Sequence, residues 1–251
     1  MGNPSETRLF AGWASDVGRV REHNEDACLA DTAQGLFIVS DGMGGQQAGA
    51  TASQIVVKVL PEMIHQRLEH LKRPSTRALR QALCDAIAEL SRRIREEATG
   101  KLGLQGMGAT VVLAYVRGRF AHVAHMGDSR AYLLRNNRLD QLTGDHSITG
   151  ILLRRGEITA RQAKEHPARG QLSRFVGMEG EAIPEARTVE LKQRDRLLLC
   201  TDGLTGMLTD KRIVQILKKD PEPTVACRAL VDAANQAGGK DNITVVIVDY
   251  E

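Results

Sequence analysis

Short apolar runs rich in β-branched residues recur along the chain, each with a glycine or an aspartate close to one end. This pattern constrains the fold more than any other feature. Each run has the length of a buried strand, and the Asp-Gly or Arg-Gly pairs near the runs are typical of turns. The runs cover residues 36–39, 110–116, 120–125, 197–200 and 243–248. We therefore expect these segments to form buried strands.

Apolar residues spaced three and four positions apart predict helices between and after these strands. One long helix is expected around a single apolar stripe, made of Leu79, Leu83, Ile87, Leu90 and Ile94. The other candidate helices cover residues 48–68, 209–218 and 224–237. Pro61 is expected to kink or break the first of these, because proline lacks the backbone N–H that an interior helical position needs.

The strands often follow one another without an intervening helix, which favours an α+β layered fold over a doubly wound sheet. The chain has 251 residues and shows no internal repeat or low-complexity linker. We therefore expect a single domain that spans residues 1–251. Residues 144–170 have the most loop-like composition and are rich in arginine.

The composition excludes several classes of partner. The net charge is +3 and aromatic residues make up 3% of the chain, so neither the basic face nor the stacking platforms of a nucleic-acid-binding protein are expected. No stretch approaches the roughly 20 apolar residues that cross a bilayer, so no membrane insertion is expected. The cysteines are widely spaced, which is typical of thiols in a reducing compartment and predicts a cytoplasmic protein. They are Cys28, Cys84, Cys200 and Cys227.

Aspartates lie beside the predicted strands. Asp41, Asp128 and Asp202 each follow a strand, Asp241 precedes the last one, and Asp26 closes an Asn-Glu-Asp segment. Carboxylates brought together at strand ends repel one another unless cations or protons neutralise them. Hard oxygen ligands of this kind favour Mg²⁺ or Mn²⁺ over Zn²⁺. The alternative is that each Asp-Gly pair only marks a turn.

Seven short motifs surround these aspartates. They are Asp16-x-Gly18-x-x-Arg21-x-x-Asn24-Glu25-Asp26, Asp41-Gly42-Met43-Gly44-Gly45, Gly108-Ala109-Thr110, Gly127-Asp128-Ser129-Arg130 with Ala131-Tyr132, Leu142-Thr143 with Asp145-His146-Ser147, Thr201-Asp202-Gly203-Leu204, and Asp241-Asn242-Ile243-Thr244. In this order, from about Trp13 to Val248, they resemble the metal-dependent protein Ser/Thr phosphatases of the protein phosphatase 2C type, in their bacterial form. One such motif is weak evidence, whereas seven in order make a specific match.

This resemblance implies a four-layer α-β-β-α sandwich, in which two antiparallel sheets pack face to face and helices flank them. It also implies a centre of two Mn²⁺ or Mg²⁺ ions at one end of the sandwich, with a third ion in bacterial members. Asp41 would bridge the two ions and the Gly42 carbonyl would coordinate one of them. Asp202 and Asp241 would complete the shell of the first ion, and Asp128 with Asp202 would hold the third.

Three further residues have roles implied by the resemblance. Glu25 and Asp26 would act near the ions, largely through bound waters. Arg21 would bind the substrate phosphate, because its planar guanidinium matches two phosphate oxygens. Cys200 is not expected to be a nucleophile, since its apolar neighbours predict a buried, inert thiol.

The implied activity is hydrolysis of phosphoserine and phosphothreonine in proteins by a metal-activated water. The implied partners are phosphoprotein substrates and a bacterial Ser/Thr kinase that the enzyme opposes, and the chain is expected to be a monomer. Compact relatives without a membrane tail include phosphatases associated with type VI secretion. Two alternatives stay open: a pseudophosphatase that binds phosphopeptides without turnover, and a phosphatase of small phosphate esters.

The sequence departs from the family pattern at a few positions. Met43 occupies the place where some members carry a proton-donating histidine, so the general acid is unassigned. His146 is a candidate, although a lone histidine beside Asp145 is more often structural. Gln46 and Ala50 replace residues that are commonly His or Asn and Glu. Residues 144–177 resemble the family's flap subdomain, whose basic side chains either engage acidic flanks of a substrate or form an ordinary solvated surface.

Overall fold

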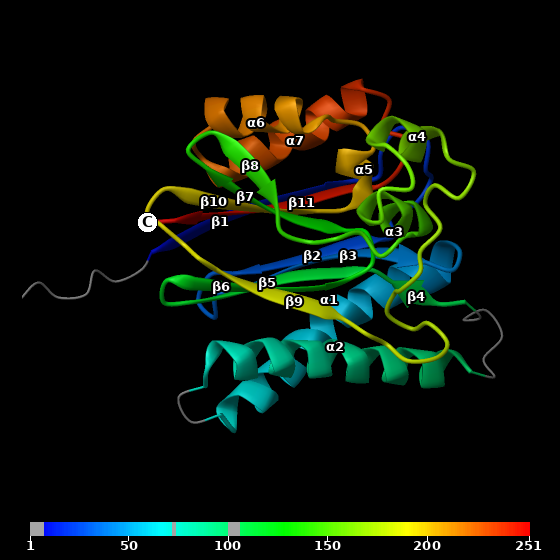
Figure 1. Ribbon diagram of the computed structural model, residues 1–251, viewed down its shortest axis with the longest axis vertical. Coiled ribbons are helices and arrows are strands. Elements are labelled where there is room, and N and C mark those ends of the chain that lie inside the picture. Colours follow the sequence, from blue (N-terminus) through cyan, green and yellow to red (C-terminus); the bar gives the residue numbers. More distant parts are fainter. Residues whose placement is uncertain (1–7, 72–73, 100–105) are drawn as a thin grey trace, which may run out of the picture.

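Two antiparallel β-sheets lie face to face at the centre of the protein, and one pair of long helices covers each outer face (Figure 1). The computed structural model describes residues 8–71, 74–99 and 106–251. This arrangement is the four-layer α-β-β-α sandwich expected from the sequence, and the α+β class is confirmed.

Each sheet has a defined strand order, and every neighbouring pair is antiparallel. Sheet I has the order β1-β11-β10-β7-β8, with β1 (Leu9–Asp16), β7 (Arg130–Arg135), β8 (Arg138–Gln141), β10 (Asp195–Cys200) and β11 (Ile243–Tyr250). Sheet II has the order β2-β3-β5-β6-β9, with β2 (Asp26–Asp31), β3 (Leu36–Met43), β5 (Val111–Arg117), β6 (Phe120–Met126) and β9 (Glu185–Glu190). The short strand β4 (Gly108–Ala109) pairs with β3.

The five strands predicted from apolar runs are confirmed as β3, β5, β6, β10 and β11, none of which lies at a sheet edge. The runs miss all four edge strands, β1, β2, β8 and β9, and also the interior strand β7, whose short apolar run lies between two arginines. An edge strand has a neighbour on one side only and exposes more of its side chains, so its sequence lacks a continuous apolar run.

The helices confirm the periodicity argument and add to it. They are α1 (Gln46–Glu69), α2 (Thr76–Ala98), α3 (Ile148–Arg154), α4 (Ala160–Glu165), α5 (Asp202–Thr205), α6 (Asp210–Lys219) and α7 (Pro223–Gln236). The predicted apolar stripe of α2 is buried along its whole length against sheet II. Ser75 caps this helix, since its Oγ accepts a hydrogen bond from the Ala78 N–H at 3.2 Å.

Two expectations about helices are wrong. Of the kink or break expected at Pro61, the break does not occur, because α1 continues through this residue. The backbone hydrogen bond lost at proline is offset by burial of Val56, Leu60 and Ile64 against sheet II and α2. Residues 144–170 are not simply a loop, because they contain α3 and α4. Their N-caps are Ser147 and Thr159, and the latter forms a capping box with Gln162.

Three apolar layers hold the sandwich together. One lies between α1, α2 and sheet II, and another lies between sheet I and the pair α6 and α7. The third lies between the two sheets and includes Phe37, Val39, Val112, Val123, Leu133, Leu197, Leu199, Val246 and Val248. Because this central layer touches both sheets, it sets how residues of sheet I lie relative to residues of sheet II.

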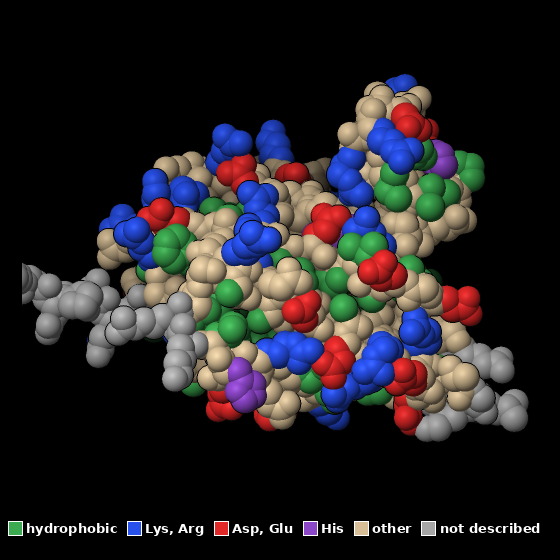
Figure 2. All heavy atoms as spheres, turned by 60° about the horizontal axis from the view of Figure 1, so that its bottom comes forward, with side chains coloured by type: hydrophobic (Ala, Val, Ile, Leu, Met, Phe, Trp, Pro, Cys, Tyr) green, Lys and Arg blue, Asp and Glu red, His purple; other side chains and the backbone are tan. Residues whose placement is uncertain are grey.

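Two surface features bear on partners. On the face shown in Figure 2, basic and acidic side chains are intermixed rather than separated into one basic patch. Among the helices that the structure describes, none combines the length and apolarity that a membrane span requires.

Truncating the central layer should cost much more stability than truncating a matched exposed residue. Phe37 is fully buried between the sheets, and Phe37→Ala should lower the free energy of unfolding by about 3–5 kcal/mol. Phe10 is 46% exposed on β1, and Phe10→Ala should cost no more than about 1 kcal/mol. Guanidinium chloride unfolding of both variants measures this difference, and equal losses would contradict the assignment of Phe37 to the core.

Candidate active site

Five aspartates meet at one end of the sandwich. Asp26 begins β2 and lies directly opposite Asp41 of β3 in the antiparallel register. Asp128 follows β6, Asp202 begins α5 just after β10, and Asp241 precedes β11. Burial raises the pKa of Asp41 well above its ordinary value, and the charges of the other four raise it further. The structure therefore brings together all five aspartates that lie beside the predicted strands.

Burial and mutual repulsion raise the pKa values of the clustered carboxyl groups. Burial is the largest cause that raises the pKa of Asp26 to about 7, of Asp128 to about 8 and of Asp202 to about 6. Repulsion adds to this effect, since the Asp202 charge raises the first two values and the Asp241 charge raises the third. Either bound protons or bound cations can relieve the repulsion among the carboxylates of such a site.

The donor set fits a divalent cation that prefers oxygen ligands. Asp26 Oδ1 is buried and has no hydrogen-bond partner among the described residues, so one carboxylate oxygen is left for another ligand. The other available donors are carboxylate oxygens and the backbone carbonyl of Gly42, which are hard ligands suited to Mg²⁺ or Mn²⁺. The sequence-based expectation of a metal centre at this end is therefore consistent with the chemistry of the residues present.

Threonine hydroxyl groups hydrogen-bond to the carboxylate of Asp26 and to the backbone of Asp41. Thr201 Oγ1 donates a hydrogen bond to Asp26 Oδ2 at 3.0 Å and accepts one from the Thr244 N–H at 3.0 Å. Thr110 Oγ1 accepts a hydrogen bond from the Asp41 N–H at 3.0 Å. Because Thr201 follows a strand of sheet I and Asp26 belongs to sheet II, the first of these bonds ties the two sheets together at the site.

The turn after Asp41 depends on glycine. A Cβ at Gly42 would collide with the Gly49 carbonyl, and a Cβ at Gly49 would collide with the Glu25 carboxylate. Gly44 and Gly45 have φ values of 117° and 87°, which side chains rarely tolerate. Glycine therefore lets α1 start directly beside the carboxylates and places Glu25 against the start of that helix.

Asn242 holds the loop between β1 and β2 through three side-chain hydrogen bonds, a role that the sequence did not reveal. Its Oδ1 accepts a hydrogen bond from the Glu25 N–H at 2.8 Å, and its Nδ2 donates to the Val17 and His23 carbonyls, both at 2.9 Å. These three bonds fix the loop between β1 and β2. Since that loop carries Arg21 and Glu25, the residue after Asp241 positions two other predicted site residues.

Arg21 lies at the rim of the cluster. Its side chain is 54% exposed, and Nη2 donates to Asp241 Oδ2 at 2.9 Å. The guanidinium is therefore accessible from solvent while it touches one of the five aspartates. Arg169 also reaches this end, because its positive charge lowers the pKa of Asp202 and its guanidinium lies beside Gly206.

His146 lies in a structural network rather than in the open site. It is 1% exposed and stacks on His125 with ring centroids 4.4 Å apart. Its Nδ1 accepts from the Gly127 N–H at 3.3 Å, and its Nε2 lies 3.2 Å from Glu185. Burial and the neighbouring His125 lower the pKa of His146 to about 4, so it is neutral near pH 7. These contacts favour the structural alternative over proton donation.

Three other residues that the sequence singles out are Cys200, Ala50 and Gln46. Cys200 is fully buried, and burial raises its thiol pKa to about 12, as expected for an inert thiol. Ala50 is half-buried in α1, whose first turn contains no acidic residue. The side chain of Gln46 lies outside what the structure describes.

The layered fold and the carboxylate cluster define a class of protein, the metal-dependent phosphatases. The family model for protein phosphatase 2C matches residues 18–220. Serine/threonine phosphatase stp of Listeria monocytogenes is 37% identical over 246 residues, which cover 97% of this chain and 96% of the relative.

Solved structures give the same result. PppA, described as a key regulatory component of T6SS in Pseudomonas aeruginosa, is 32% identical with a TM-score of 0.79, over 98% of this chain and 100% of that chain. The catalytic domain of the phosphatase PstP, in complex with two manganese ions, is 32% identical with a TM-score of 0.77, over 97% and 99% of the two chains. The chain therefore belongs to the protein phosphatase 2C family and is a phosphoprotein phosphatase that depends on divalent metal.

Without metal, the folded protein should lose stability from about pH 4, near the ordinary aspartate pKa, up to about pH 8, because the pKa values of Asp202, Asp26 and Asp128 are raised to about 6, 7 and 8. Between the ordinary pKa and each raised pKa the folded chain holds a proton that the unfolded chain has already released, so stability falls as the pH rises toward each folded-state pKa and levels off above it. For each proton involved, the loss is about 1.4 kcal/mol per pH unit, or roughly 3–5 °C in melting temperature. Calorimetry in EDTA measures it.

Two variants control this experiment. Asp128→Asn should show a shallower decline, because one titrating group is gone. Asp85→Asn, on the exposed face of α2, should keep the wild-type slope. A metal-free protein whose melting temperature rises over the same pH range would contradict the account.

Proposed function

We propose that this phosphatase hydrolyses phosphoserine and phosphothreonine side chains of other proteins by direct attack of water on phosphorus. The observation that carries the proposal is the cluster of five aspartates at one end of the sandwich, of which Asp26 is buried and has one unpaired carboxylate oxygen. The 37% identity to a serine/threonine phosphatase over nearly the whole chain supports the substrate class.

The proposed metal ligands are four of the five aspartates and one carbonyl. Asp41 and the Gly42 carbonyl lie at the end of β3 and, together with Asp202 and Asp241, would hold two ions. Asp128 with Asp202 would hold a third ion. When bound, such ions lower the pKa of a water ligand and stabilise charge on the phosphoryl oxygens. The PstP structure with two manganese ions supports Mn²⁺, with Mg²⁺ as the alternative.

Glu25 and Asp26 are proposed to orient waters around the ions. Asp26 lies opposite Asp41 and has an unpaired Oδ1, while Thr201 holds its other oxygen. The Glu25 carboxylate lies against Gly49 at the start of α1, and Asn242 holds its backbone. Both carboxylates are thus fixed by neighbours that leave oxygens available to water.

Arg21 is proposed to bind the substrate phosphate. Its contact with Asp241 holds the guanidinium at the rim of the cluster, and its exposure lets an incoming phosphate reach the remaining N–H groups. A bidentate contact there would orient the phosphorus toward the water. Neither Met43 nor the neutral, buried His146 supplies a proton to the leaving oxygen, so the proton is proposed to come from water.

The cellular setting is proposed from the family. The enzyme acts as a monomer in the cytoplasm and opposes a Ser/Thr kinase, with residues 1–251 forming one phosphatase domain and residues 144–177 its flap. Similarity to PppA supports a narrower proposal, in which the substrates belong to a type VI secretion system.

Loss of single ligands should abolish turnover. Asp202→Asn and Asp241→Asn should each lower kcat/KM for a phosphothreonine peptide by at least about 100-fold in Mn²⁺, because each removes a charged metal ligand. EDTA should abolish wild-type activity, and Asp85→Asn should leave it unchanged. Full activity of either cluster variant with added Mn²⁺ would contradict the proposal. Turnover of metabolite esters but not of phosphopeptides would instead favour a small-ester phosphatase.

Arg21 should act mainly on substrate binding. Arg21→Lys keeps the positive charge but loses the planar guanidinium that matches two phosphate oxygens. KM for the phosphopeptide should therefore rise by about tenfold, with a smaller change in kcat. Arg92→Lys, in an exposed ion pair on α2, is the matched control and should behave like wild type. An unchanged KM for Arg21→Lys would exclude direct phosphate binding by this side chain.

A further inference from the structure

The outer edge of β1 has no role in the hydrolysis proposed above. β1 pairs with β11 on one side only. Arg8 and Glu251 exchange both backbone N–H···O bonds, at 2.9 and 3.0 Å, which sets the alternation along the pair. In this alternation the backbone groups that point away from β11 belong to Leu9, Ala11, Trp13 and Ser15. Within the described part of the chain, no backbone hydrogen bond reaches these groups.

This edge lacks the protection that exposed strands usually carry. Natural edge strands are blunted by charges, proline or bulges, since an open edge otherwise pairs with other chains. The edge strands β8 and β9 follow this rule, with Arg138 and Asp140 on the first and Glu185, Arg187 and Glu190 on the second. In β1, no charged residue or proline occurs before Asp16, so its edge is chemically open to an added strand.

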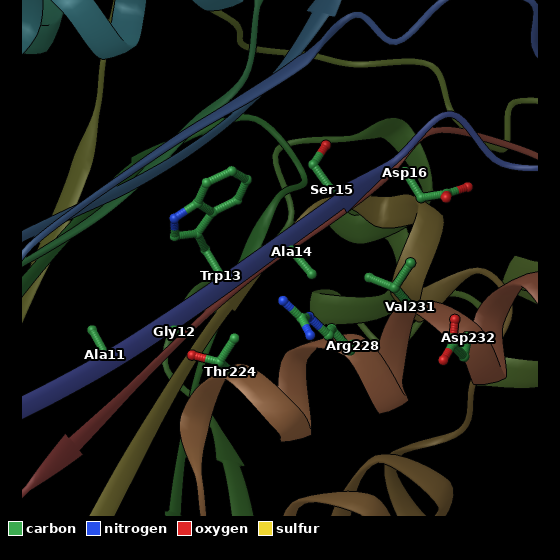
Figure 3. Close-up of a pocket in the computed structure, with 10 residues that line it drawn as sticks. All are labelled: Ala11, Gly12, Trp13, Ala14, Ser15, Asp16, Thr224, Arg228, Val231 and Asp232. Atoms are coloured by element: carbon green, nitrogen blue, oxygen red, sulfur yellow. The ribbon is translucent and has the colours of Figure 1, made fainter.

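Side chains on both faces of this edge are available for contact. Trp13 is the single tryptophan of the chain and is 57% exposed. Figure 3 shows its ring on the side of β1 that faces away from α7. On the other side a cavity of about 530 Å³ lies between β1 and α7, lined by Arg228, Val231 and Asp232 among others. Arg228 forms no ion pair within the described residues.

The edge is held rigidly in place. A Cβ at Gly12 would collide with the backbone of Thr224 at the start of α7, so strand and helix are in direct backbone contact. Pro223 begins that helix, and Glu222 caps it through the Thr224 and Val225 N–H groups. An added strand would therefore meet a preformed surface and lose little free energy to reordering it.

The edge leads directly to the proposed phosphate site. β1 ends at Asp16, whose carboxylate accepts a hydrogen bond from the Gly18 N–H at 2.9 Å. The loop then continues to Arg21, which contacts Asp241. Asn24 Nδ2 donates to Ser15 Oγ at 2.8 Å and ties the end of the strand to the same loop. A chain lying along β1 thus extends toward the carboxylate cluster.

We propose that the free edge of β1 binds an extended segment of the phosphoprotein substrate as an added β-strand, next to the phosphorylated residue. This inference rests on the proposed protein phosphatase function. Main-chain hydrogen bonds would come from the outward groups of Ala11 and Trp13, and alternate side chains would meet opposite faces. An apolar residue packs on Trp13, and a polar residue on the other face enters the cavity lined by Arg228 and Asp232.

Proline at an outward position tests the edge itself. In Ala11→Pro the missing N–H is one that faces away from β11, so the β1–β11 ladder is kept while strand addition is blocked. Trp13→Ala removes the apolar contact without touching the backbone. Ile183→Ala, an exposed apolar residue elsewhere, is the matched control. Melting temperature and turnover of p-nitrophenyl phosphate check that each variant is folded and has an intact metal centre.

Two peptide substrates distinguish binding at the β1 edge from hydrolysis at the carboxylate cluster. One is a short phosphothreonine peptide that reaches only the cleft. The other carries a strand-length extension of alternating apolar and uncharged polar residues. For the long peptide, Ala11→Pro and Trp13→Ala should each raise KM by about tenfold, while p-nitrophenyl phosphate and the short peptide should be processed as by wild type. An unchanged KM for the long peptide, or an equal loss on all three substrates, would overturn the proposal.

Trp13 also gives a readout that does not depend on turnover. The dephosphorylated long peptide should shift the emission of this single tryptophan saturably, and a version with prolines in the extension should not. The shift should be absent in Ala11→Pro. A shift that follows protein concentration without peptide, together with a dimer in sedimentation, would assign the edge to a second copy and overturn the proposal. Wild type inactive on every phosphorylated substrate would instead refute the proposed function.

Discussion

Repulsion among five aspartates gathered at one end of the sandwich is the interaction on which the rest of the structure depends. Burial raises the pKa values of Asp26, Asp41, Asp128 and Asp202, and the charges of neighbouring aspartates raise them further. A fold can keep such a cluster only if packing elsewhere holds it and if cations or protons neutralise it. The central apolar layer supplies the first condition, and the metal ions of the family supply the second.

The cluster spans both sheets, and this explains why a sandwich suits the site. Asp26 and Asp41 belong to sheet II, whereas Asp202 and Asp241 flank strands of sheet I. Their separation is therefore set by the packing of the two sheets and by the hydrogen bond from Thr201 to Asp26. Small shifts between the sheets would change the distances among the ligands, so the core acts directly on the site. The same arrangement leaves β1 at an open edge whose end adjoins the loop of Arg21.

Much of this could be predicted from the sequence, and the reasons for the failures are physical. β3, β5, β6, β10 and β11 are continuous apolar runs because both of their faces are buried, whereas β1, with its mixture of small, aromatic and polar residues, gives no such signal. α3 and α4 are too short to show periodicity, although the Thr159 and Gln162 pair signals a cap. The aspartates could be singled out by their neighbours, but their convergence could not be derived from spacing. Thr201 and Asp26, for example, are 175 positions apart.

The positioning residues were the least predictable part of the site. Asn242 was visible in a motif, but its bonds to Glu25, Val17 and His23 depend on how a distant loop folds over β11. Arg169 lies in a basic segment where any of several arginines could have faced the cluster. The sequence therefore indicated which residues carry the chemistry, and only the fold shows what holds them.

Titration of Mn²⁺ into the metal-free protein, followed by electron paramagnetic resonance of the free ion, tests the central claim most directly. At least two ions should bind per chain near pH 7, with proton release on binding because the aspartates with raised pKa values must ionise. Asp41→Asn should lose most of this binding while remaining folded. Absence of bound Mn²⁺ in wild type, or equal binding by Asp41→Asn, would show that the five aspartates are not a metal centre.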